Sequence, residues 1–352
     1  MSNLIFKNKV IMITGGCGSI GKEIIKQLIA FEPKEIRVFD NWETGFFNLG
    51  LDTSIKANIL TNIIGDVRNK EEINSSLKGV DVVFHAAALK HVPFCELNPF
   101  AAINTNVIGT QNVLEGCINN NINHLLYIST DKAINPINTM GATKLLGERL
   151  ITNTNIQNKN HRFSAVRFGN VLNSVGSVIP IFREQIKRGG PLTITSKAMT
   201  RFFMSMKDAV SLVIKACTIT KGGEIFILKM KSVKIFDLAE VLIEELSPIY
   251  GYKPSDIIIN LIGVRAGEKL HESLISNEEL PLCVEKKKLL VINNKQKTTL
   301  QKIKPDIIFK ENSQENKIST YSSNNAQFLD KKEIKKLLYK QNILNYENFT
   351  NK

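Results

Sequence analysis

The sequence lacks any hydrophobic run long enough to cross a membrane. Its longest apolar stretches, such as Val80–Leu89, stop well short of the roughly 18 to 20 residues that a membrane span requires. Residues 1–9 also lack the apolar core of a secretory signal. With 43% hydrophobic and 22% charged residues, the 352-residue chain can form one substantial core or two modest ones. We therefore expect a globular, cytoplasmic protein without a membrane span.

Cysteine is scarce and scattered. The five cysteines form no CxxC pair and have no Cys/His spacing of the kind that holds zinc. The histidines His85, His91 and His271 likewise have no other candidate ligands at metal-binding spacing. We predict no metal site and no disulfide framework, and we interpret these cysteines as reduced, packed thiols: Cys17, Cys95, Cys117, Cys217 and Cys283.

Positive charge is abundant, but it is concentrated near the C-terminus and contains no arginine there. Of the net charge of +13, residues 281–352 contribute +8, from 15 Lys against 7 acidic residues. Neither a helix-turn-helix, a zinc finger nor an aromatic stacking platform accompanies this excess. The interpretation we favour is a solvated lysine-rich face, without a nucleic-acid partner.

Short β-branched runs alternate with helical patterns over the first two thirds of the chain. This alternation is typical of an α/β fold with a Rossmann-type, doubly wound parallel sheet. The predicted strands are Lys9–Thr14, Glu35–Asp40, Asn62–Val67, Val80–Ala88, His124–Thr130 and Phe163–Phe168. The predicted helices between them are Ile20–Ala30, Lys70–Leu77, Pro99–Asn119 and Thr139–Asn153.

After Phe168 the pattern becomes mixed, which favours a smaller α/β lobe. We predict a Rossmann domain over 1–170 with further segments from the C-terminal part, a mostly substrate-binding lobe over 171–294, and a connector with a C-terminal helix over 295–352. The connector is the polar segment Lys295–Ser323, and Asp330 with Glu333 caps the final helix. The elements predicted after Phe168 are strands Leu192–Thr195, Glu224–Leu228 and Ile257–Ile262 and helices Ser205–Thr218, Ile235–Ser247 and Gly267–Ser276.

A glycine-rich turn follows the first predicted strand and leads straight into a helix. Glycines there allow the backbone to approach a pyrophosphate, which the free amides of the helix N-terminus can bind. Such glycines alone could form a purely structural turn, but the strand before them and the helix after them favour a dinucleotide site. The predicted cofactor-binding residues of this turn are Gly15, Gly18, Ser19, Ile20 and Gly21.

Asp40 ends the second predicted strand 19 residues after Gly21, where a carboxylate can bond a ribose 2′-hydroxyl. The same carboxylate would repel the 2′-phosphate of NADP, and no Arg or Lys follows within residues 41–48. NAD is therefore favoured over NADP. Further residues predicted to meet the cofactor are Asp66 and Val67, placed for an adenine edge, and the small side chains Ala86, Ala87 and Ala88.

A candidate reacting centre follows the fifth predicted strand. Thr130, Asp131 and Lys132 end that strand, and Lys144 lies on the next helix with Met140 four residues before it. This arrangement resembles the short-chain dehydrogenase/reductase site, in which Ser or Thr orients the substrate, a Tyr takes the hydroxyl proton and Lys holds the nicotinamide ribose. Methionine cannot exchange protons, so a Tyr-dependent alcohol dehydrogenase or 4-epimerase is disfavoured.

Five motifs together resemble the UDP-N-acetylglucosamine 4,6-dehydratases of bacterial polysaccharide and glycan biosynthesis, from about residue 6 to residue 276. Some members of that family also carry Met in place of Tyr, and its larger members have a membrane region that this sequence lacks. The motifs are Phe84–Pro93 (FHAAALKHVP), Ser129–Ala133 (STDKA), Met140–Lys144 (MGATK), Arg167–Val171 (RFGNV) and Arg265–Leu270 (RAGEKL).

The resemblance implies oxidation of a UDP-sugar at C4, loss of water across C5 and C6, and reduction at C6 with NAD regenerated. It assigns the C5 proton to Lys132 and protonation of the departing C6 hydroxyl to Asp131, and either Asp131 or a water would take the C4 hydroxyl proton. Residues that it places on the UDP-sugar are Lys90, Asn170, Arg201, Arg265 and Glu268.

Two alternatives stay open at this stage. One is a nucleotide-sugar epimerase or reductase of the same superfamily, and the other is a non-catalytic NAD-binding regulator. By analogy with relatives that form dimers or hexamers, we expect a homo-oligomer that uses helices 99–119 and 139–153.

Overall fold

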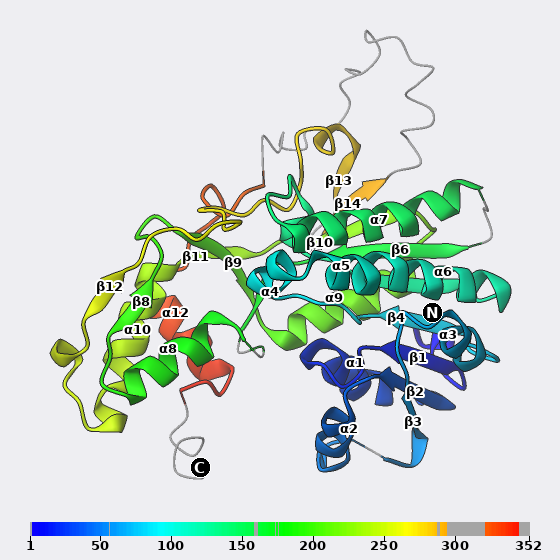
Figure 1. Ribbon diagram of the computed structural model, residues 1–352, viewed down its shortest axis with the longest axis horizontal. Helices are drawn as coiled ribbons and strands as arrows, with labels where there is room; N and C mark the ends of the chain where they lie inside the picture. The colour runs from blue at the N-terminus through cyan, green and yellow to red at the C-terminus, as the bar shows by residue number, and fades with distance from the viewer. Residues whose placement is uncertain are drawn as a thin grey trace, which may run out of the picture. The chain divides into compact units, whose positions relative to one another are not determined.

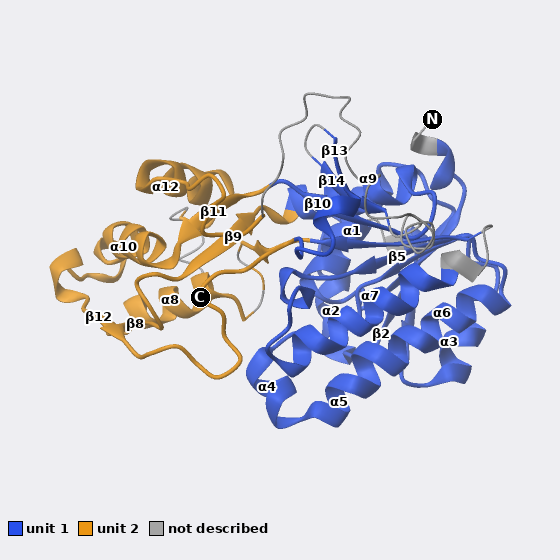
Figure 2. Ribbon diagram, turned by 90° about the horizontal axis from the view of Figure 1, so that it is seen from above, with its two compact units in different colours: residues 1–167, 207–229, 275–319 blue, residues 168–206, 230–274, 320–352 orange. Residues whose placement is uncertain are grey.

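The structure is a computed structural model of the chain, and it describes residues 2–55, 57–157, 161–172, 174, 176–286, 289–293 and 321–344. The predicted connector therefore lies outside the described residues as far as residue 320. The chain packs into two compact units (Figure 2). Unit 1 comprises residues 1–167, 207–229 and 275–319, and unit 2 comprises residues 168–206, 230–274 and 320–352.

Unit 1 is built on a nine-stranded sheet with the strand order β13-β14-β10-β6-β5-β4-β1-β2-β3. The strands β1 to β6 and β10 are parallel, while β14 and β13 add an antiparallel edge. The predicted doubly wound α/β fold is confirmed. The strands are β1 (Val10–Thr14), β2 (Glu35–Asp40), β3 (Leu60–Ile64), β4 (Val82–His85), β5 (His124–Ile128), β6 (Arg162–Arg167), β10 (Glu224–Leu228), β13 (Cys283–Lys286) and β14 (Leu289–Asn293).

Helices cover both faces of this sheet (Figure 1). On one face α3, α6 and α7 pack together. On the other, Gln27 of α1 donates a hydrogen bond to the Lys207 carbonyl of α9. The helices of unit 1 are α1 (Ser19–Ile29), α2 (Glu43–Gly50), α3 (Lys70–Ser76), α4 (Val92–Leu97), α5 (Pro99–Ile103), α6 (Gly109–Asn119), α7 (Thr139–Gln157) and α9 (Met206–Ile219).

The predicted helix 99–119 is present, but a π turn at Asn104–Ile108 joins its two α-helical parts, α5 and α6. The amphipathic pattern that predicted α1 buries one face, with Gly21, Ile24, Ile25 and Leu28 inside. Short helical turns occur at Ser2–Ile5, Ala57–Ile59, Asp131–Ala133 and Leu280–Leu282.

Unit 2 contains a three-stranded sheet, β11-β9-β7, and a two-stranded sheet, β12-β8. Its core forms where α8, α10 and α12 bury their apolar faces. The Asp330–Glu333 cap of α12 is confirmed, because each side chain accepts a hydrogen bond from the other's backbone N–H. The elements are β7 (Asn170–Val171), α8 (Val178–Lys187), β8 (Leu192–Ile194), β9 (Thr200–Met204), β11 (Lys231–Lys234), α10 (Ile235–Leu246), β12 (Ile259–Leu261) and α12 (Lys331–Lys340), with short turns at Pro248–Tyr250 and Pro254–Asp256.

Several sequence predictions need correction. The helix predicted at Gly267–Ser276 is wrong: Gly267 has a φ of +74°, and backbone groups of this segment pair with a distant one. Leu274 N–H donates to the Tyr321 carbonyl, and the Glu272 carbonyl accepts from Ser323. Strand β10 and helix α9, which we expected in the smaller lobe, belong to unit 1. Strand β3 ends at Ile64 rather than at residue 67.

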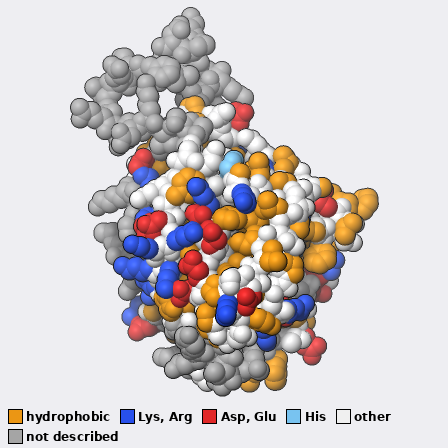
Figure 3. All heavy atoms as spheres, turned by 90° about the vertical axis from the view of Figure 1, so that its left-hand side faces the viewer, with side chains coloured by type: hydrophobic (Ala, Val, Ile, Leu, Met, Phe, Trp, Pro, Cys, Tyr) orange, Lys and Arg blue, Asp and Glu red, His pale blue; other side chains and the backbone are white. Residues whose placement is uncertain are grey.

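Charged side chains of both signs are mixed on the face that Figure 3 shows. In unit 2, Lys331 of α12 pairs with Glu240 of α10 at 3.0 Å, and Lys335 pairs with Glu245 at 2.5 Å. These lysines of the basic C-terminal part are therefore charge-compensated by a neighbouring helix. Within the described part of the chain, no helix combines the length and the apolar composition needed to cross a membrane.

Candidate active site

The glycine turn after β1 is shaped by backbone contacts that leave no room for side chains. Gly15 has a φ of +67°, and a Cβ on it would lie 2.6 Å from the Ala87 nitrogen. A Cβ on Gly21 would meet the Gly15 carbonyl oxygen and lie 2.6 Å from the Gly16 Cα. Only glycine fits both positions, and the predicted residues Gly18, Ser19 and Ile20 lie between them at the start of α1.

A directed chain of hydrogen bonds fixes the end of β4 beside this turn. The Thr110 hydroxyl donates to the Asn106 carbonyl at 2.7 Å, so it accepts from Nε2–H of His85 at 3.0 Å. Nδ1 of His85 then accepts from the Thr14 hydroxyl at 2.6 Å. Burial lowers the pKa of His85 to about 3, which keeps the ring neutral. These hydrogen bonds connect the end of β4 to Thr14, the last residue before the glycine turn. Ala86 N–H also donates to the Thr14 carbonyl, so the predicted cofactor contacts Ala86, Ala87 and Ala88 begin next to that turn.

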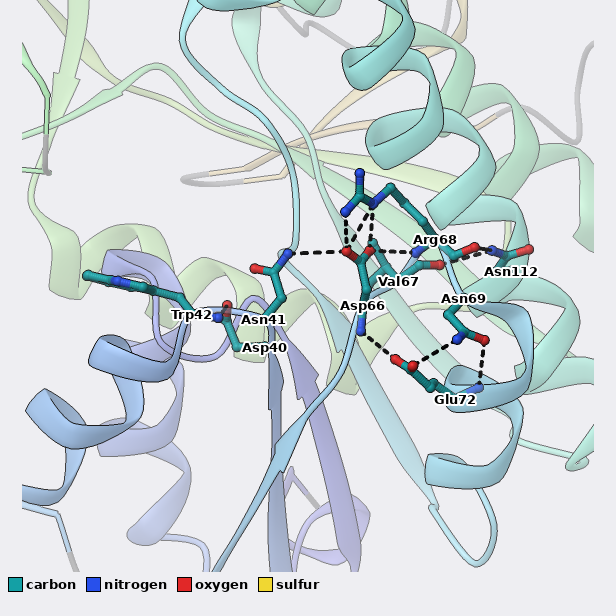
Figure 4. A network of polar contacts seen from close by, with 9 residues as sticks. All are labelled: Asp40, Asn41, Trp42, Asp66, Val67, Arg68, Asn69, Glu72 and Asn112. Carbon is teal, nitrogen blue, oxygen red and sulfur yellow. Dashed lines mark hydrogen bonds and ion pairs between the residues drawn. The ribbon is translucent and has the colours of Figure 1, made fainter.

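Asp40 lies at the glycine turn, as its predicted role requires. One of its carboxylate oxygens accepts from Cys17 N–H at 3.0 Å, and the other accepts from Trp42 N–H at 3.1 Å. Figure 4 shows the side chain of Asn41, in the loop after β2, directed at the Asp66 carboxylate in the loop after β3. Asn41 donates to the Asp66 carboxylate at 3.3 Å. The structure thus joins two predicted cofactor contacts, Asp40 and Asp66, through one loop.

The loop after β3 is held by polar contacts from three elements (Figure 4). Asn112 of α6 donates to the carbonyls of Val67 and Arg68 at 3.0 and 3.1 Å. Arg68 binds the Asp66 carboxylate through Nε and Nη2, and these bonds lower the pKa of Asp66. Glu72 of α3 accepts from Asp66 N–H at 2.8 Å. Sequence reasoning missed Arg68, although its position beside Asp66 and Val67 was visible.

Thr130, Asp131 and Lys132 form a compact group directly after β5. The Thr130 hydroxyl and the Lys132 ammonium both donate to Oδ1 of Asp131, each at 2.9 Å. Asp131 is completely buried, and its Oδ2 has no hydrogen-bond partner. Because β1, β4 and β5 are adjacent and parallel, this group follows the same sheet edge as the glycine turn and Ala86. The structure therefore brings the predicted acid and base to the cofactor edge of the sheet.

Lys144 and Met140 lie on α7, which packs against the turn that holds Lys132. The Lys144 ammonium is buried, donates to the Ile128 carbonyl at 2.5 Å and lies 4.1 Å from the ring centre of Tyr127. Burial lowers the pKa of Lys144 to about 7, against the opposing effect of Glu148. Met140 is buried in a small apolar cluster with Cys95 and Ala102. Met140 has no exchangeable proton, so it cannot take the role of the Tyr that the short-chain dehydrogenase/reductase site has at this position.

The predicted substrate residues are divided between the units. In unit 1, Lys90 follows Leu89, whose N–H and carbonyl both bond to the Asn106 side-chain amide. In unit 2, Arg201 is buried and donates to the carbonyls of Thr200 and Leu270 at 2.8 and 3.1 Å. Its guanidinium therefore has backbone partners already.

The other substrate candidates lie near Arg201 in unit 2 or on its sheet. Nη2 of Arg201 lies 3.7 Å from a Glu268 oxygen. The second oxygen of Glu268 accepts from Arg265 N–H at 3.3 Å, and the Arg265 side chain is exposed. Asn170 opens β7, paired with β9. Among the described residues, no group of histidine, cysteine or acidic side chains is arranged to hold a metal.

Sequence and structure comparisons show which known proteins this chain resembles. Residues 11–294 match the family described as polysaccharide biosynthesis protein. An uncharacterized membrane protein of Methanocaldococcus jannaschii is 52% identical over 95% of this chain and 96% of its own length. The structure of Pen from Bacillus thuringiensis has a TM-score of 0.86 and 38% identity, covering 97% of this chain and 99% of that one.

Two groups of relatives carry different activities in their names. An inverting UDP-N-acetylglucosamine 4,6-dehydratase of Campylobacter jejuni is 42% identical over 80% of this chain and 81% of its own length. A UDP-glucose 4-epimerase of Rickettsia typhi is 44% identical over 78% of this chain and 80% of its own length. Identity alone does not separate dehydration from epimerisation, so the side chains of the site have to decide.

Proposed function

Because the chain belongs to the polysaccharide biosynthesis family, within the extended short-chain dehydrogenase/reductases, we propose that it is an NAD-dependent 4,6-dehydratase of a nucleotide-activated sugar. The substrate proposed is UDP-N-acetylglucosamine, and the product is a UDP-4-keto-6-deoxy-N-acetylhexosamine for surface polysaccharide or glycan synthesis. The observation that carries the proposal is the buried Asp131 carboxylate bonded to Lys132 at the end of β5.

The residues around the glycine turn fit NAD. A Cβ at Gly15 or Gly21 would clash with the protein's own backbone, so glycine at these positions keeps the turn tight. The free amides at the start of α1, which follow this turn, are the groups that would bind the pyrophosphate. Asp40 would bond the adenosine ribose, Asp66 and Val67 the adenine edge, and Lys144 the nicotinamide ribose. Ala86, Ala87 and Ala88 present no bulk that would obstruct the cofactor. When bound, NAD would supply the oxidation at C4 and the later reduction at C6, and so be regenerated.

The proton transfers would be made by three neighbouring side chains. Thr130 would orient the C4 hydroxyl, and Asp131 would take its proton through the carboxylate. Once the Lys132 ammonium had lost a proton to solvent, the neutral amine would remove the C5 proton, which the C4 ketone has made acidic. Asp131 would return its proton to the departing C6 hydroxyl as water leaves, and the C5 proton would be restored by Lys132 or solvent. Each proton removed is thereby accounted for.

A UDP-sugar also needs cationic groups for its diphosphate. We propose that Arg265, whose side chain is exposed, grips the diphosphate, with Glu268 on a hydroxyl and Asn170 on a phosphate oxygen. Lys90 would reach the phosphates or the sugar from the loop after β4. Arg201, which already bonds two carbonyls, would act by shaping the Glu268 segment as well as by closing over the nucleotide.

A homo-oligomer, a dimer or a hexamer, is part of the proposal. The support lies on α4 and α5, which expose large apolar side chains: Phe94 is 67% exposed, Leu97 78% and Phe100 81%. Apolar side chains this exposed favour burial against another chain. Light scattering coupled to size-exclusion chromatography measures the mass directly, and a monomer at all concentrations would refute this part.

The second candidate is an epimerase, which the names of the Rickettsia relatives favour and the buried Met140 opposes. Incubation of the purified protein with UDP-N-acetylglucosamine separates the candidates. We expect a product lighter by one water, formed without added NADH. A product of unchanged mass and inverted C4 would show an epimerase, and turnover that requires NADH would show a reductase. NAD binding without any turnover would leave the non-catalytic regulator.

A further inference from the structure

Behind the predicted cofactor lysine lies a group of buried charges that the proposed reaction does not use. Arg167, at the end of β6, is completely buried between two carboxylates. Its Nε and Nη2 donate to Glu148 at 2.8 and 2.6 Å, and its Nη1 and Nη2 donate to Glu279 at 2.7 and 2.8 Å. Glu279 also accepts from Ser276 N–H at 3.1 Å. All three groups belong to unit 1.

When all three side chains are ionised, the triad of Arg167, Glu148 and Glu279 has a net charge of −1, from two carboxylates and one guanidinium. The three side chains are buried, so water does not solvate this charge. Burial opposes ionisation of Glu279, but its bonds to Arg167 outweigh that effect and lower its pKa. Burial also opposes the charge on Arg167, and the two carboxylates more than restore it, so that its pKa is raised. These directions favour the ionised forms of Glu279 and Arg167, and Glu148 forms an ion pair with Arg167 at 2.6 Å.

Two cations of α7 act on the carboxylates of this triad: Arg149 acts on Glu279, and the buried Lys144 is acted on by Glu148. Glu148 follows Lys144 by four residues on α7, the spacing that places two side chains on one helix face. The other titratable groups facing Lys144 do not offer a compensating charge near neutral pH. Burial lowers the pKa of His85 and raises that of Tyr127, so both stay neutral. In the turn packed against α7, the charges of Asp131 and Lys132 pair with each other.

We propose that Arg167 and Glu279 are positioning residues which act through Glu148: the triad supplies the net negative charge that keeps the Lys144 ammonium charged while it holds the cofactor. Arg167 fixes the orientation of Glu148. Glu279 neutralises the positive charge of Arg167, which would otherwise offset the electrostatic attraction between Glu148 and Lys144. The inference rests on the proposed NAD-binding role of Lys144. A purely structural triad would need no particular charge sum.

The experiment measures NAD affinity by calorimetry between pH 6 and pH 9. Glu279→Gln leaves the shape nearly unchanged but makes the triad neutral. We expect the pH at which NAD affinity is half lost to fall by about one unit, the lower end of the shift that a lost opposite charge produces. The double variant Arg167→Gln/Glu279→Gln restores the net charge of −1 through Glu148, and its midpoint should return to that of the unmodified enzyme.

The matched control is Glu115→Gln, the same chemical change in an exposed ion pair with Lys70 of the same unit, which should shift nothing. Two outcomes would overturn the proposal. One is an unchanged pH midpoint of NAD affinity in Glu279→Gln, and the other is a midpoint in the double variant that differs from the unmodified enzyme by more than that of Glu279→Gln. The second outcome is what a purely structural triad predicts, because each lost side chain would then add to the damage. If the unmodified protein bound no NAD at any pH, the proposed function would fail instead.

Should Glu279→Gln not fold, the unmodified enzyme still provides a test. Calorimetric titration with NAD at pH 8 in two buffers of different ionisation enthalpy reports protons taken up on binding. Because the pKa of free Lys144 is about 7, a lysine that becomes charged with cofactor must take up a proton at pH 8 and much less at pH 6. Proton uptake of zero at pH 8 would overturn the proposal.

Discussion

The Lys132 ammonium lies 2.9 Å from Oδ1 of Asp131, a carboxylate that is completely buried and whose other oxygen has no hydrogen-bond partner. Lys132 itself keeps 23% of its side chain exposed. The pair therefore combines a shielded carboxylate with an amine that can reach a ligand. A surface ion pair would have both groups in water and would carry no such asymmetry.

Replacing either member of this pair should stop dehydration. We expect Lys132→Met and Asp131→Asn to reduce turnover by about 10²- to 10⁴-fold, the usual contribution of a general acid or base. NAD affinity should change little, because neither residue is assigned to the cofactor. Mass spectrometry of the nucleotide-sugar product and calorimetry with NAD measure the two effects. Lys70→Met, at an exposed ion pair, is the control, and full activity in Lys132→Met would refute the assignment.

Restoring a tyrosine at position 140 should not create an epimerase. Met140 lies in an apolar cluster with Cys95 and Ala102, so a phenol there would be overpacked and its hydroxyl buried. We expect Met140→Tyr to lower the free energy of unfolding by about 1–3 kcal/mol, whereas Met140→Leu should cost less than about 1.5 kcal/mol. Denaturant titration gives the stabilities. An active, stable Met140→Tyr enzyme that interconverts C4 epimers would contradict this prediction.

The glycine turn should tolerate no methyl group. A Cβ on Gly15 would lie 2.6 Å from the Ala87 nitrogen, and one on Gly21 would meet the Gly15 carbonyl oxygen. Gly15→Ala and Gly21→Ala should therefore abolish NAD binding or prevent folding. Gly50, inside the last turn of α2, has nothing within 4 Å of such a Cβ. Gly50→Ala should bind NAD normally and gain up to about 1 kcal/mol. Fluorescence of Trp42, the single tryptophan, can follow cofactor binding.

Acid should destabilise the protein through His85. Burial lowers its pKa from 6.5 to about 3, so the unfolded chain binds a proton in this interval that the folded chain does not. The free energy of unfolding should thus fall as pH drops from 6.5 toward 3, and this contribution should be fully present above pH 6.5. Urea titrations of the unmodified protein and of His85→Gln measure the slope. An equal slope in both would show that other groups are responsible.

Local sequence patterns determined the framework of the dinucleotide site. β-Branched runs predicted the parallel strands β1 to β6, because strands in the interior of such a sheet need apolar residues throughout. The bounds of β3 were predicted less well, since this edge strand buries none of its residues. Gly15, Gly21 and Asp40 could be identified because their roles depend on the few residues next to them. Thr130, Asp131 and Lys132 could likewise be placed at the sheet edge from the end of β5.

Tertiary structure decided what depends on distant partners. Whether Gly267–Ser276 forms a helix was settled by backbone bonds to residues 321 and 323, which no local pattern encodes. Helical spacing placed Glu148 beside Lys144, but the bonds from Arg167 to Glu148 and Glu279 span 19 and 112 residues. The sequence by itself determined the sheet, the glycine turn and the chemical groups that follow β5. The burial of Met140, Arg201 and Arg167 required the folded chain, because exposure is a property of everything that packs around a side chain.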